Sequence, residues 1–437
     1  MITCHTSNAQ SVPLDDGNGA FATGRYRNLF AEAGHSTSEI RQKVDGAFDR
    51  LFHGDPANEA IYYDAGSNSN GPLAYITDIK HRDVRTEGLS YGMIICTQLD
   101  KKKEFDALWN WSMTYLYHDD PTDPGYGFFA WQARTNGVRM SQNIAPDGEE
   151  YYVMALFFAA GRWGSGEGIY DYKAQALSLL HRLRHREWIV GPQLPITGGR
   201  GGFGGRGRGP IGSGPLFDEE NKMVLFSPES RNTNALTTGF TDPSYHLPAF
   251  YELWARWGAP EDRDFWIGAA QNSRDYLIKA AHPVTALTPH DTAFDGSLRG
   301  GRGGFGGAPH FDYDACRTAG NWSVDWSWWG KDPRQHELSN KIQAFFESKG
   351  MDTYGCQYTL DGEPYPPNNP DIRHAEGVVA VNAVASLAAT NEERATKFVE
   401  ALWNTPTPAG LERYYEGLLY MMSMLHCSGE FRIWPPR

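Results

Sequence analysis

The sequence predicts an all-α fold in which about six antiparallel helical hairpins close into a ring. About a dozen segments place apolar residues at helical spacing, and few segments alternate with the period of two that marks a strand. Several helical segments, including 151–160 and 377–389, are apolar almost all round, which indicates inner helices covered by outer ones. A helical solenoid is the main alternative, although the sequence shows no repeat of fixed period.

The expected helices follow one another along nearly the whole chain. In order, they cover residues 38–52, 89–99, 104–117, 149–163, 172–185, 243–257, 264–281, 321–329, 334–348, 375–389, 393–403 and 412–426. The connections at 68–83 and 117–132 are long and rich in Gly, Pro, Asp and Tyr. Because long ordered loops usually carry function, we expect these loops to form a binding cleft.

Two Gly/Arg insertions interrupt the chain, at 198–209 and 300–307, and they share one octapeptide. Their composition is typical of flexible loops in solvent. Arg-Gly-Gly tracts can also bind RNA through charge and aromatic stacking, which is the alternative interpretation.

The formal net charge of −13 argues against nucleic acid or an anionic membrane as a partner, since both are negatively charged. Five cysteines without CxxC spacing, and the absence of a nucleotide-binding motif, predict neither a metal nor a cofactor. The amino terminus lacks the basic start and the apolar run of a secretory signal, and no stretch of about 20 apolar residues could span a membrane. We therefore expect a cytoplasmic monomer that acts on a neutral substrate.

Two carboxylates stand at the starts of expected helices. Glu87 precedes the apolar segment 89–99, and Asp147 follows a proline just before the segment 149–163. Each has an ordinary structural interpretation when taken alone, Glu87 as a favourable charge at a helix start and Asp147 as an N-cap.

A third group of acids, Asp312, Asp314 and Asp325, lies in a segment that otherwise has the aromatic composition of a core. Ionised carboxylates in an apolar core need ion-pair or hydrogen-bond partners. Arg317 follows Asp314 by three residues and could keep its carboxylate ionised. A purely structural ion pair between these two residues explains the pattern equally well.

Acids at helix starts could supply the two carboxyl groups that hydrolysis of a glycosidic bond requires, one protonated and one ionised. The positive end of its helix favours the ionised form of Glu87, which opposes a role as proton donor. A neighbouring carboxylate would restore protonation by repulsion, and Asp147 is the candidate for that neighbour. In the loop 117–132, Trp131 offers a flat face on which a sugar ring could stack, unless it fills the core beneath the loop.

Several segments together resemble glycoside hydrolase family 8, and within it the exo-oligoxylanases that release xylose from the reducing end. The motifs follow the order of the family: TEGLSYGM, GYGFFAWQ, APDGEEYY, TDPSYHLPAFYELW, YDACR and RHAEG. The resemblance runs from about GRYRNLFAEAGHS to the carboxyl-terminal helix. It implies a single (α/α)6 barrel domain over 1–437, an inverting mechanism and β-1,4-linked xylo-oligosaccharide substrates. The two Gly/Arg insertions depart from the family pattern.

The resemblance also implies residue roles. Glu87 matches the general acid, and Asp314 matches the base that activates water. Asp147 matches the carboxylate that holds the central sugar in a distorted conformation. Tyr245 is similar to the tyrosine near the base and the attacking water, and Arg317 to the arginine paired with the base.

Two further residues are assigned by the same resemblance. Trp131 matches an aromatic residue of the central subsite. His374 resembles the loop histidine that closes the cleft and hydrogen-bonds the anomeric hydroxyl of the reducing-end sugar, although a histidine near a helix start is often only structural.

Other functions remain open at this point. An endo-acting xylanase, glucanase or chitosanase of the same family is the nearest alternative. A sugar-binding protein that has lost catalysis would need Glu87 or Asp314 replaced, and both are present.

Overall fold

A computed structural model describes residues 12–191, 211–230, 239–299, 309–366 and 373–437. Helices dominate these residues and the strands are short, which confirms the all-α prediction at the level of secondary structure. Each of the twelve expected helical segments overlaps one of the helices α3 to α14. The Gly/Arg insertions at 198–209 and 300–307 lie outside the described residues.

Two sets of long helices alternate along the chain. The outer set exposes one face to solvent and consists of α3 (Thr37–His53), α5 (Lys102–Tyr115), α7 (Tyr172–His185), α9 (Arg263–Ala280), α11 (Arg334–Ser348) and α13 (Glu392–Asn404). The inner set is buried along most of its length and consists of α4 (Thr86–Gln98), α6 (Pro146–Trp163), α8 (Pro248–Trp257), α10 (Arg317–Trp329), α12 (Glu376–Val384) and α14 (Arg413–Cys427). The all-round apolar segments of the sequence fall in α6 and α12, as inner helices require.

The remaining helical elements are short. They are α1 (Ala20–Thr23), α2 (Leu29–Glu32) and the 3-10 helices η1 (Gly168–Tyr170), η2 (Pro243–Tyr245), η3 (Pro260–Asp262), η4 (Tyr313–Cys316), η5 (Ala385–Leu387) and η6 (Gly410–Glu412). None of the described helices has the length and apolar character needed to cross a membrane.

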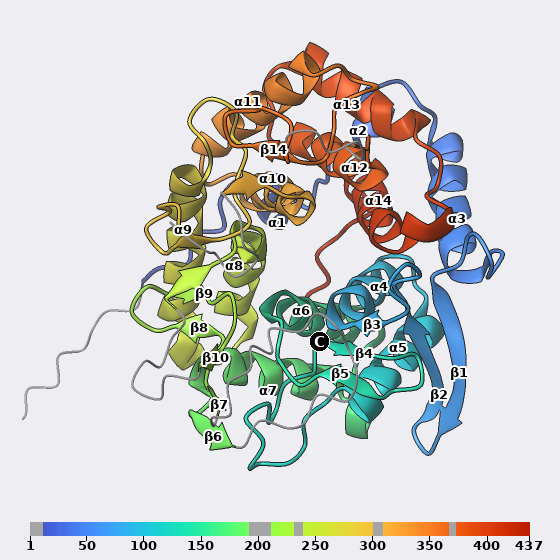
Figure 1. The fold of residues 1–437 in the computed structure, drawn as a ribbon, viewed down its shortest axis with the longest axis vertical. Helices are drawn as coiled ribbons and strands as arrows, with labels where there is room; N and C mark the ends of the chain where they lie inside the picture. Colours follow the sequence, from blue (N-terminus) through green and yellow to red (C-terminus); the bar gives the residue numbers. More distant parts are fainter. Residues whose placement is uncertain (1–11, 192–210, 231–238, 300–308, 367–372) are drawn as a thin grey trace, which may run out of the picture.

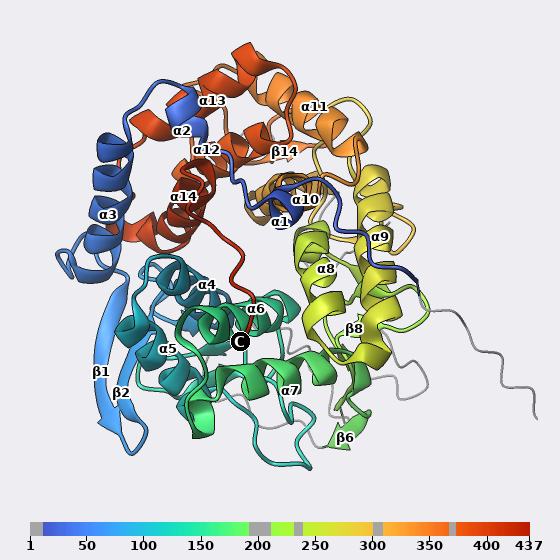
Figure 2. The same ribbon diagram turned by 180° about the vertical axis from the view of Figure 1, so that it is seen from behind.

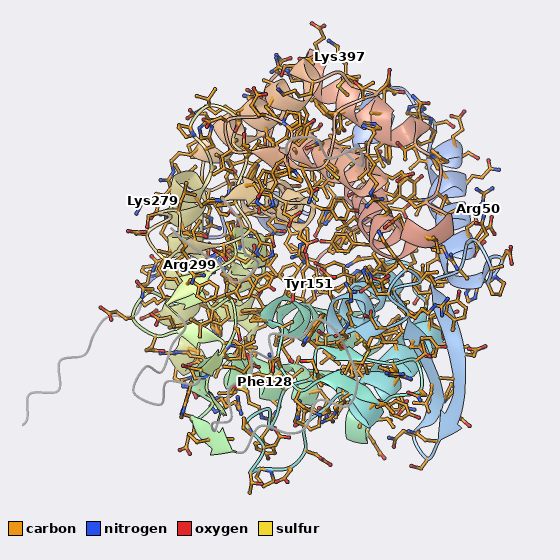
Figure 3. The ribbon with its side chains drawn as sticks, in the orientation of Figure 1. Arg50, Phe128, Tyr151, Lys279, Arg299 and Lys397 are labelled. Atoms are coloured by element: carbon orange, nitrogen blue, oxygen red, sulfur yellow. The ribbon has the colours of Figure 1, made fainter. Side chains whose placement is uncertain are left out.

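The inner helices surround the centre of the molecule (Figures 1 and 2). Contacts join α4 to α6, α8 to α10, α10 to α12, α12 to α14, and α14 back to α4. Residues from all six inner helices line a central pocket. Figure 3 shows Tyr151 of α6 near the centre, whereas Arg50, Lys279 and Lys397 lie at the periphery on outer helices.

One expected helix is divided. The segment 243–257 forms η2 and then α8, which begins only at Pro248. Proline lacks the backbone N–H of a helix interior and disfavours helical dihedrals in the residue before it, so the helix starts at the proline. The break leaves Tyr245 in the turn η2, just before the start of α8.

Short strands pair within the long connections. The largest hairpin joins β1 (Tyr62–Asn68) to β2 (Gly71–Ile76) and projects at one side of the ring (Figure 1); part of this hairpin lies in the segment 68–83, which was expected to be a loop. The other sheets join β3 (Val84–Arg85), β4 (Gln132–Ala133) and β5 (Arg139–Ser141); β6 (Ile189–Gly191), β7 (Ile211–Ser213) and β10 (Glu229–Ser230); β8 (Phe217–Asp218) and β9 (Met223–Val224); β11 (Phe240–Thr241) and β12 (Thr292–Ala293); β13 (His310–Phe311) and β14 (Tyr358–Thr359).

The residues after α14 cross the middle of the ring toward α6 (Figure 2). Phe431 stacks on His426, with ring centroids 4.0 Å apart, and lines the central pocket. Trp434 donates its Nε1 hydrogen to Gln98 and packs under the guanidinium of Arg162. This segment ties the last helix to α4 and α6.

Candidate active site

Glu87 lies in the first turn of α4, directly after strand β3. Arg85, at the N-cap, makes no side-chain cap to this helix. The backbone N–H of Thr86 donates instead to the carbonyl of Trp131, at 3.0 Å, which ties the helix start to the loop 117–132. Glu87 and Trp131, which the sequence singled out separately, are therefore neighbours in the structure.

Arg317, the first residue of α10, joins three elements of the ring. Its Nη1 donates to Glu87 Oε1 at 2.6 Å, to Asp147 Oδ2 at 2.9 Å and to the Tyr91 hydroxyl at 2.9 Å. Its Nη2 donates to Ser244 Oγ at 2.8 Å. One buried guanidinium thus holds two carboxylates from different helices side by side.

The prediction that Arg317 pairs with the Asp314 carboxylate was wrong. Arg317 reaches Asp314 only through the backbone, where Nε donates to the Asp314 carbonyl at 3.3 Å. Among the described residues, no ion pair joins the Arg317 guanidinium to the Asp314 carboxylate. Asp314 belongs to the turn η4, while the guanidinium of Arg317 extends toward α4 and α6, so its charge pairs with Glu87 and Asp147.

Asp147 occupies the first turn of α6, after Pro146 at the helix start. Ala145, not Asp147, is the N-cap, so the ordinary capping interpretation does not describe this residue. One carboxylate oxygen accepts from the N–H of Gly148 at 2.9 Å, and the other accepts from Arg317. The side chain is buried, with 8% of it exposed.

Burial and neighbouring charge raise the pKa of Glu87 to about 8. Loss of solvation is the largest cause, and it disfavours the ionised form. Arg317 lowers the pKa of Glu87, whereas the negative charges of Asp147 and Asp314 raise it further. The helix N-terminus was expected to favour ionisation of Glu87, but burial outweighs that field. Glu87 can therefore remain protonated near neutral pH and donate a proton.

Tyr245 closes the turn η2 beside this group. Its ring lies with its centroid 5.8 Å from the Arg317 guanidinium and stacks on Phe226, with centroids 5.9 Å apart. Asn321 of α10 donates to the Ser244 carbonyl at 2.8 Å, which fixes the turn against α10. Burial, and then the charges of nearby carboxylates, raise the pKa of the Tyr245 hydroxyl well above its usual range, so it remains a hydrogen-bond donor.

The other two acids of the third group have structural surroundings. Asp312 is the N-cap of η4 and accepts from the N–H of Tyr313 at 2.8 Å. Asp325 accepts two hydrogen bonds of 2.7 Å from Arg274. Of these three acids, only Asp314 contributes to the surroundings of Glu87 and Arg317.

His374 lies just before α12, and its side chain is exposed. Its Nδ1 is 2.8 Å from the carbonyl oxygen of Tyr354, and its ring meets the edge of the Tyr354 ring. Among the described residues, no contact joins His374 to Glu87 or Asp314. The preceding residues 367–372 lie outside the described ranges.

Two tyrosines at this site were missed by the sequence analysis. Tyr414 and Tyr415 stand in the first turn of α14, and their buried hydroxyl groups have no hydrogen-bond partner among the described residues. A Cβ atom on Gly88 would lie 2.5 Å from the Tyr414 hydroxyl, so Gly88 leaves the space that this ring occupies. The sequence did contain a sign of this position. The two tyrosines stand at the start of an expected helix, as Glu87 and Asp147 do.

Comparisons with known proteins agree with these observations. The sequence model of the family described as "Glycosyl hydrolases family 8" matches residues 63–204. The "Reducing-end xylose-releasing exo-oligoxylanase Rex8A" of Paenibacillus barcinonensis is 42% identical over 96% of this chain and 99% of its own length. A "Reducing end xylose-releasing exo-oligoxylanase" of Halalkalibacterium halodurans is 41% identical over 96% of this chain and 97% of its own length.

Solved structures show the same relationship. The crystal structure of a family 8 xylobiose complex from Teredinibacter turnerae is 48% identical in sequence, with a TM-score of 0.86 over 96% of this chain and 100% of that one. The structure of Rex8A from Paenibacillus barcinonensis complexed with xylose is 41% identical, with a TM-score of 0.82 over 95% of this chain and 100% of that one. With relatives of this identity along almost its whole length, the chain belongs to family 8 of the glycosyl hydrolases and is a glycoside hydrolase.

Proposed function

We propose that this enzyme hydrolyses β-1,4-linked xylo-oligosaccharides and releases xylose from the reducing end. Three relatives named for this activity match 93% to 96% of the chain at 34% to 42% identity. The geometry that carries the proposal is a buried carboxyl group of raised pKa, Glu87, held beside a second carboxylate by one guanidinium. The raised pKa keeps Glu87 protonated near neutral pH, as the general acid of a mechanism with two carboxyl groups requires.

The proposed mechanism is inversion. Glu87 gives its proton to the glycosidic oxygen as the bond from that oxygen to the anomeric carbon breaks. Asp314 takes a proton from a water molecule, whose oxygen forms the new bond to the anomeric carbon from the opposite face. This requires the two carboxyl groups to lie about 6.5–9.5 Å apart, which leaves room for the water.

Other residues of the site bind and orient the sugar. We assign Asp147 to the central sugar, whose distorted conformation it would hold, and Tyr245 to the attacking water. Arg317 fixes Asp147 and Glu87 relative to each other. Trp131 would provide the stacking surface of the central subsite, since its backbone is bonded to the start of α4.

The alternating helices support an (α/α)6 barrel as the architecture. Each inner helix from α4 to α12 packs against the outer helix that follows it, α14 packs against α3, and α14 meets α4. We propose that the whole chain, 1–437, forms this single catalytic domain, with the two Gly/Arg insertions as additions to its loops. Helix starts from α4, α6, α10 and α14 then meet at one end of the ring, where the site lies.

The raised pKa of Glu87 predicts the alkaline limb of the pH profile. A general acid works only while protonated, so kcat/KM should fall as the pH rises through about 8. In Asp147→Asn, a negative charge that disfavours ionisation of Glu87 is lost, so the pKa of Glu87 should fall and the limb should move to lower pH. The measurement is kcat/KM for xylotriose from pH 5 to 10 in both proteins. A limb that stays in place or moves to higher pH in the variant would contradict this account of Glu87.

Direction of attack depends on His374. Since the Tyr354 carbonyl can only accept, the proton of a neutral His374 ring lies on Nδ1, which leaves Nε2 to accept from an anomeric hydroxyl. Xylotriose should yield xylose from its reducing end and xylobiose, whereas the reduced alditol should react slowly. Because the His374 side chain is exposed, loss of this hydrogen bond should cost about 0.5–1.5 kcal/mol.

The test is a digest of xylotriose labelled at its reducing end, compared with xylotriitol, and followed by NMR for the first-formed anomer. His374→Ala should reduce the discrimination between the two substrates more than it slows hydrolysis of xylotriose. Equal cleavage of both substrates by the unmodified enzyme would reject the exo reaction, and a β-anomer formed first would reject inversion.

A second candidate is cleavage within longer chains. The Teredinibacter turnerae protein, at 48% identity, is also described as a xylanase in complex with xylohexaose. Endo-action would release mixed oligomers from polymeric xylan, while the proposed exo-action would leave polymeric xylan almost untouched. Product size from xylan therefore separates the two candidates.

A further inference from the structure

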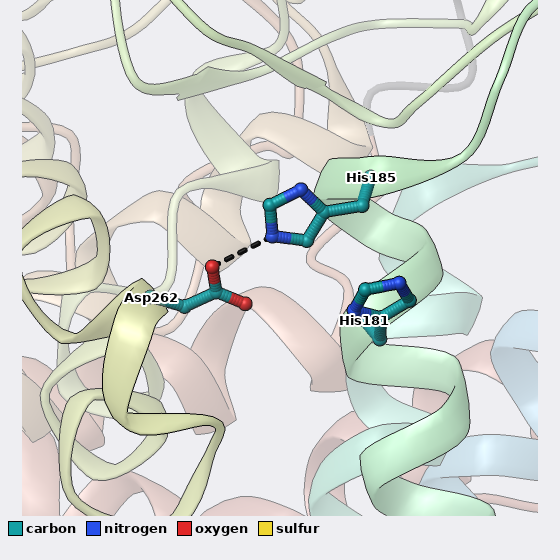
Figure 4. A group of neighbouring side chains, drawn as sticks. All are labelled: His181, His185 and Asp262. Carbon is teal, nitrogen blue, oxygen red and sulfur yellow. Dashed lines mark hydrogen bonds and ion pairs between the residues drawn. The ribbon is translucent and has the colours of Figure 1, made fainter.

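A group of three possible metal ligands lies on the outer layer of the molecule, at the end of α7. His181 and His185 are four residues apart on this helix, so they share one face. Their rings are stacked, with centroids 4.7 Å apart and planes 29° apart. Asp262, the last residue of η3, faces them (Figure 4).

Asp262 is oriented toward α7 rather than toward its own helix. It is the N-cap of α9, a position where an aspartate usually accepts from the helix backbone, yet it makes no such cap. Its Oδ1 is instead 2.6 Å from His185 Nε2 and 2.6 Å from Arg184 Nη1. Only 3% of the side chain is exposed. The carboxylate is therefore held in place before any ion arrives.

The second carboxylate oxygen of Asp262 points toward the side on which His181 lies (Figure 4). One donor atom from each of His181, His185 and Asp262 lies within 4.8 Å of the others. Ligands of a tetrahedral zinc ion, at about 2.0–2.1 Å from the metal, are separated by roughly 3.3 Å. Rotation of the two exposed imidazole side chains can bring the nitrogens this much closer.

We propose that His181, His185 and Asp262 bind one divalent transition metal ion of the zinc class. Two imidazole nitrogens with one carboxylate favour zinc, nickel or copper over magnesium and calcium, which prefer oxygen ligands. The ion replaces the direct hydrogen bond between His185 and Asp262 and takes a water molecule as its fourth ligand. Arg184 stays bound to Asp262 and to Glu219, and so orients the carboxylate.

The ion links the end of α7 to the turn between α8 and α9, two outer parts of the ring that are distant in sequence. Such a link stabilises the folded state by an amount that grows with the ratio of the free ion concentration to the Kd of the site.

The metal site is separate from the catalytic group, because none of its ligands contacts Glu87, Asp147, Asp314 or Arg317 among the described residues. The site is therefore independent of the proposed hydrolytic function.

The test uses the full chain without an affinity tag, titrated with zinc sulfate by calorimetry and with cobalt(II) by visible absorption. The matched control is His53→Ala, which removes an exposed histidine that faces one carboxylate, Glu104 at 3.2 Å, but has no second imidazole beside it in the described part of the chain. We expect one ion per chain, absorption bands of tetrahedral cobalt, and a higher Tm in the presence of zinc. His181→Ala and His185→Ala should each weaken binding by at least about tenfold, whereas His53→Ala should not change it.

Two outcomes would overturn the proposal. One is the absence of saturable zinc binding in the unmodified chain. The other is binding of equal strength after both histidines are replaced, which would place the ion elsewhere. The two histidines are exposed, so their replacement should leave the fold intact, and unchanged hydrolysis of xylotriose confirms that the variant is folded.

Discussion

Replacing Glu87 with glutamine should lower kcat/KM for xylotriose by at least about 10²-fold, since general acid catalysis contributes about 10²- to 10⁴-fold. Glutamine has nearly the same shape and can still accept from Arg317, but it has no proton to give to the leaving oxygen. The measurement is steady-state hydrolysis, with circular dichroism and Tm to establish that the variant is folded. A rate near that of the unmodified enzyme would remove Glu87 from the mechanism.

Asp314→Asn should cause a loss of the same order, because inversion also needs a base to activate water. Glu150→Gln is the matched control. Glu150 is a fully buried carboxyl in α6 whose pKa is also raised by burial, but it accepts from the Tyr251 hydroxyl at 2.6 Å, and no hydrogen bond or ion pair among the described residues joins it to Arg317. Its replacement should leave kcat/KM within about tenfold of the unmodified value. A loss in the control as large as in Glu87→Gln would mean that packing around α6, and not proton transfer, explains the effect.

Arg274→Met should lower the free energy of unfolding by about 3–5 kcal/mol, the range found when one partner of a buried ion pair is removed. Arg274 of α9 donates to both carboxylate oxygens of Asp325, at 2.7 Å each, and to Glu252 at 2.9 Å. All three side chains are at most 3% exposed. Methionine fills a similar volume but leaves two buried carboxylates with less positive charge around them.

The measurement is urea denaturation of both proteins at neutral pH. Arg334→Met serves as the control, because Arg334 also binds two carboxylates, Asp332 and Asp275, but is 43% exposed. Exposed ion pairs contribute about 0–1 kcal/mol, so the control should lose no more than that. Equal losses in the two variants would show that burial of the Arg274 group does not determine its contribution.

The helices were predictable because their signal is local. The apolar periodicity of twelve segments depends only on which face of each segment is buried, and every one of these segments overlaps a helix in the structure. The break before Pro248 and the hairpin that includes Gly71–Ile76 were not predicted. In the first case a helical pattern hid a proline boundary, and in the second a short strand without regular alternation looked like a loop.

The candidate site was predictable only in part. Glu87 and Asp147 were recognised from their places at helix starts, and the structure brings both to the same guanidinium. The roles of Trp131, Tyr245 and His374 came from the family resemblance and stay predictions. Tyr414 and Tyr415 were overlooked because aromatic residues in an apolar helix have the same pattern whether they fill a core or face a site.

The sequence by itself determined the helical segments, the family and the positions of the acids along the chain, because these follow from local pattern and from motif order. Only the tertiary structure decided which charges meet. Arg317 was expected to pair with Asp314, three residues away, but the folded ring places Glu87 and Asp147 at its guanidinium. The same packing raises the pKa of Glu87, although its helix start alone would favour the ionised form. The reason is physical: solvation and the distances between charges from different helices depend on how the helices pack, and no local pattern in the chain contains that information.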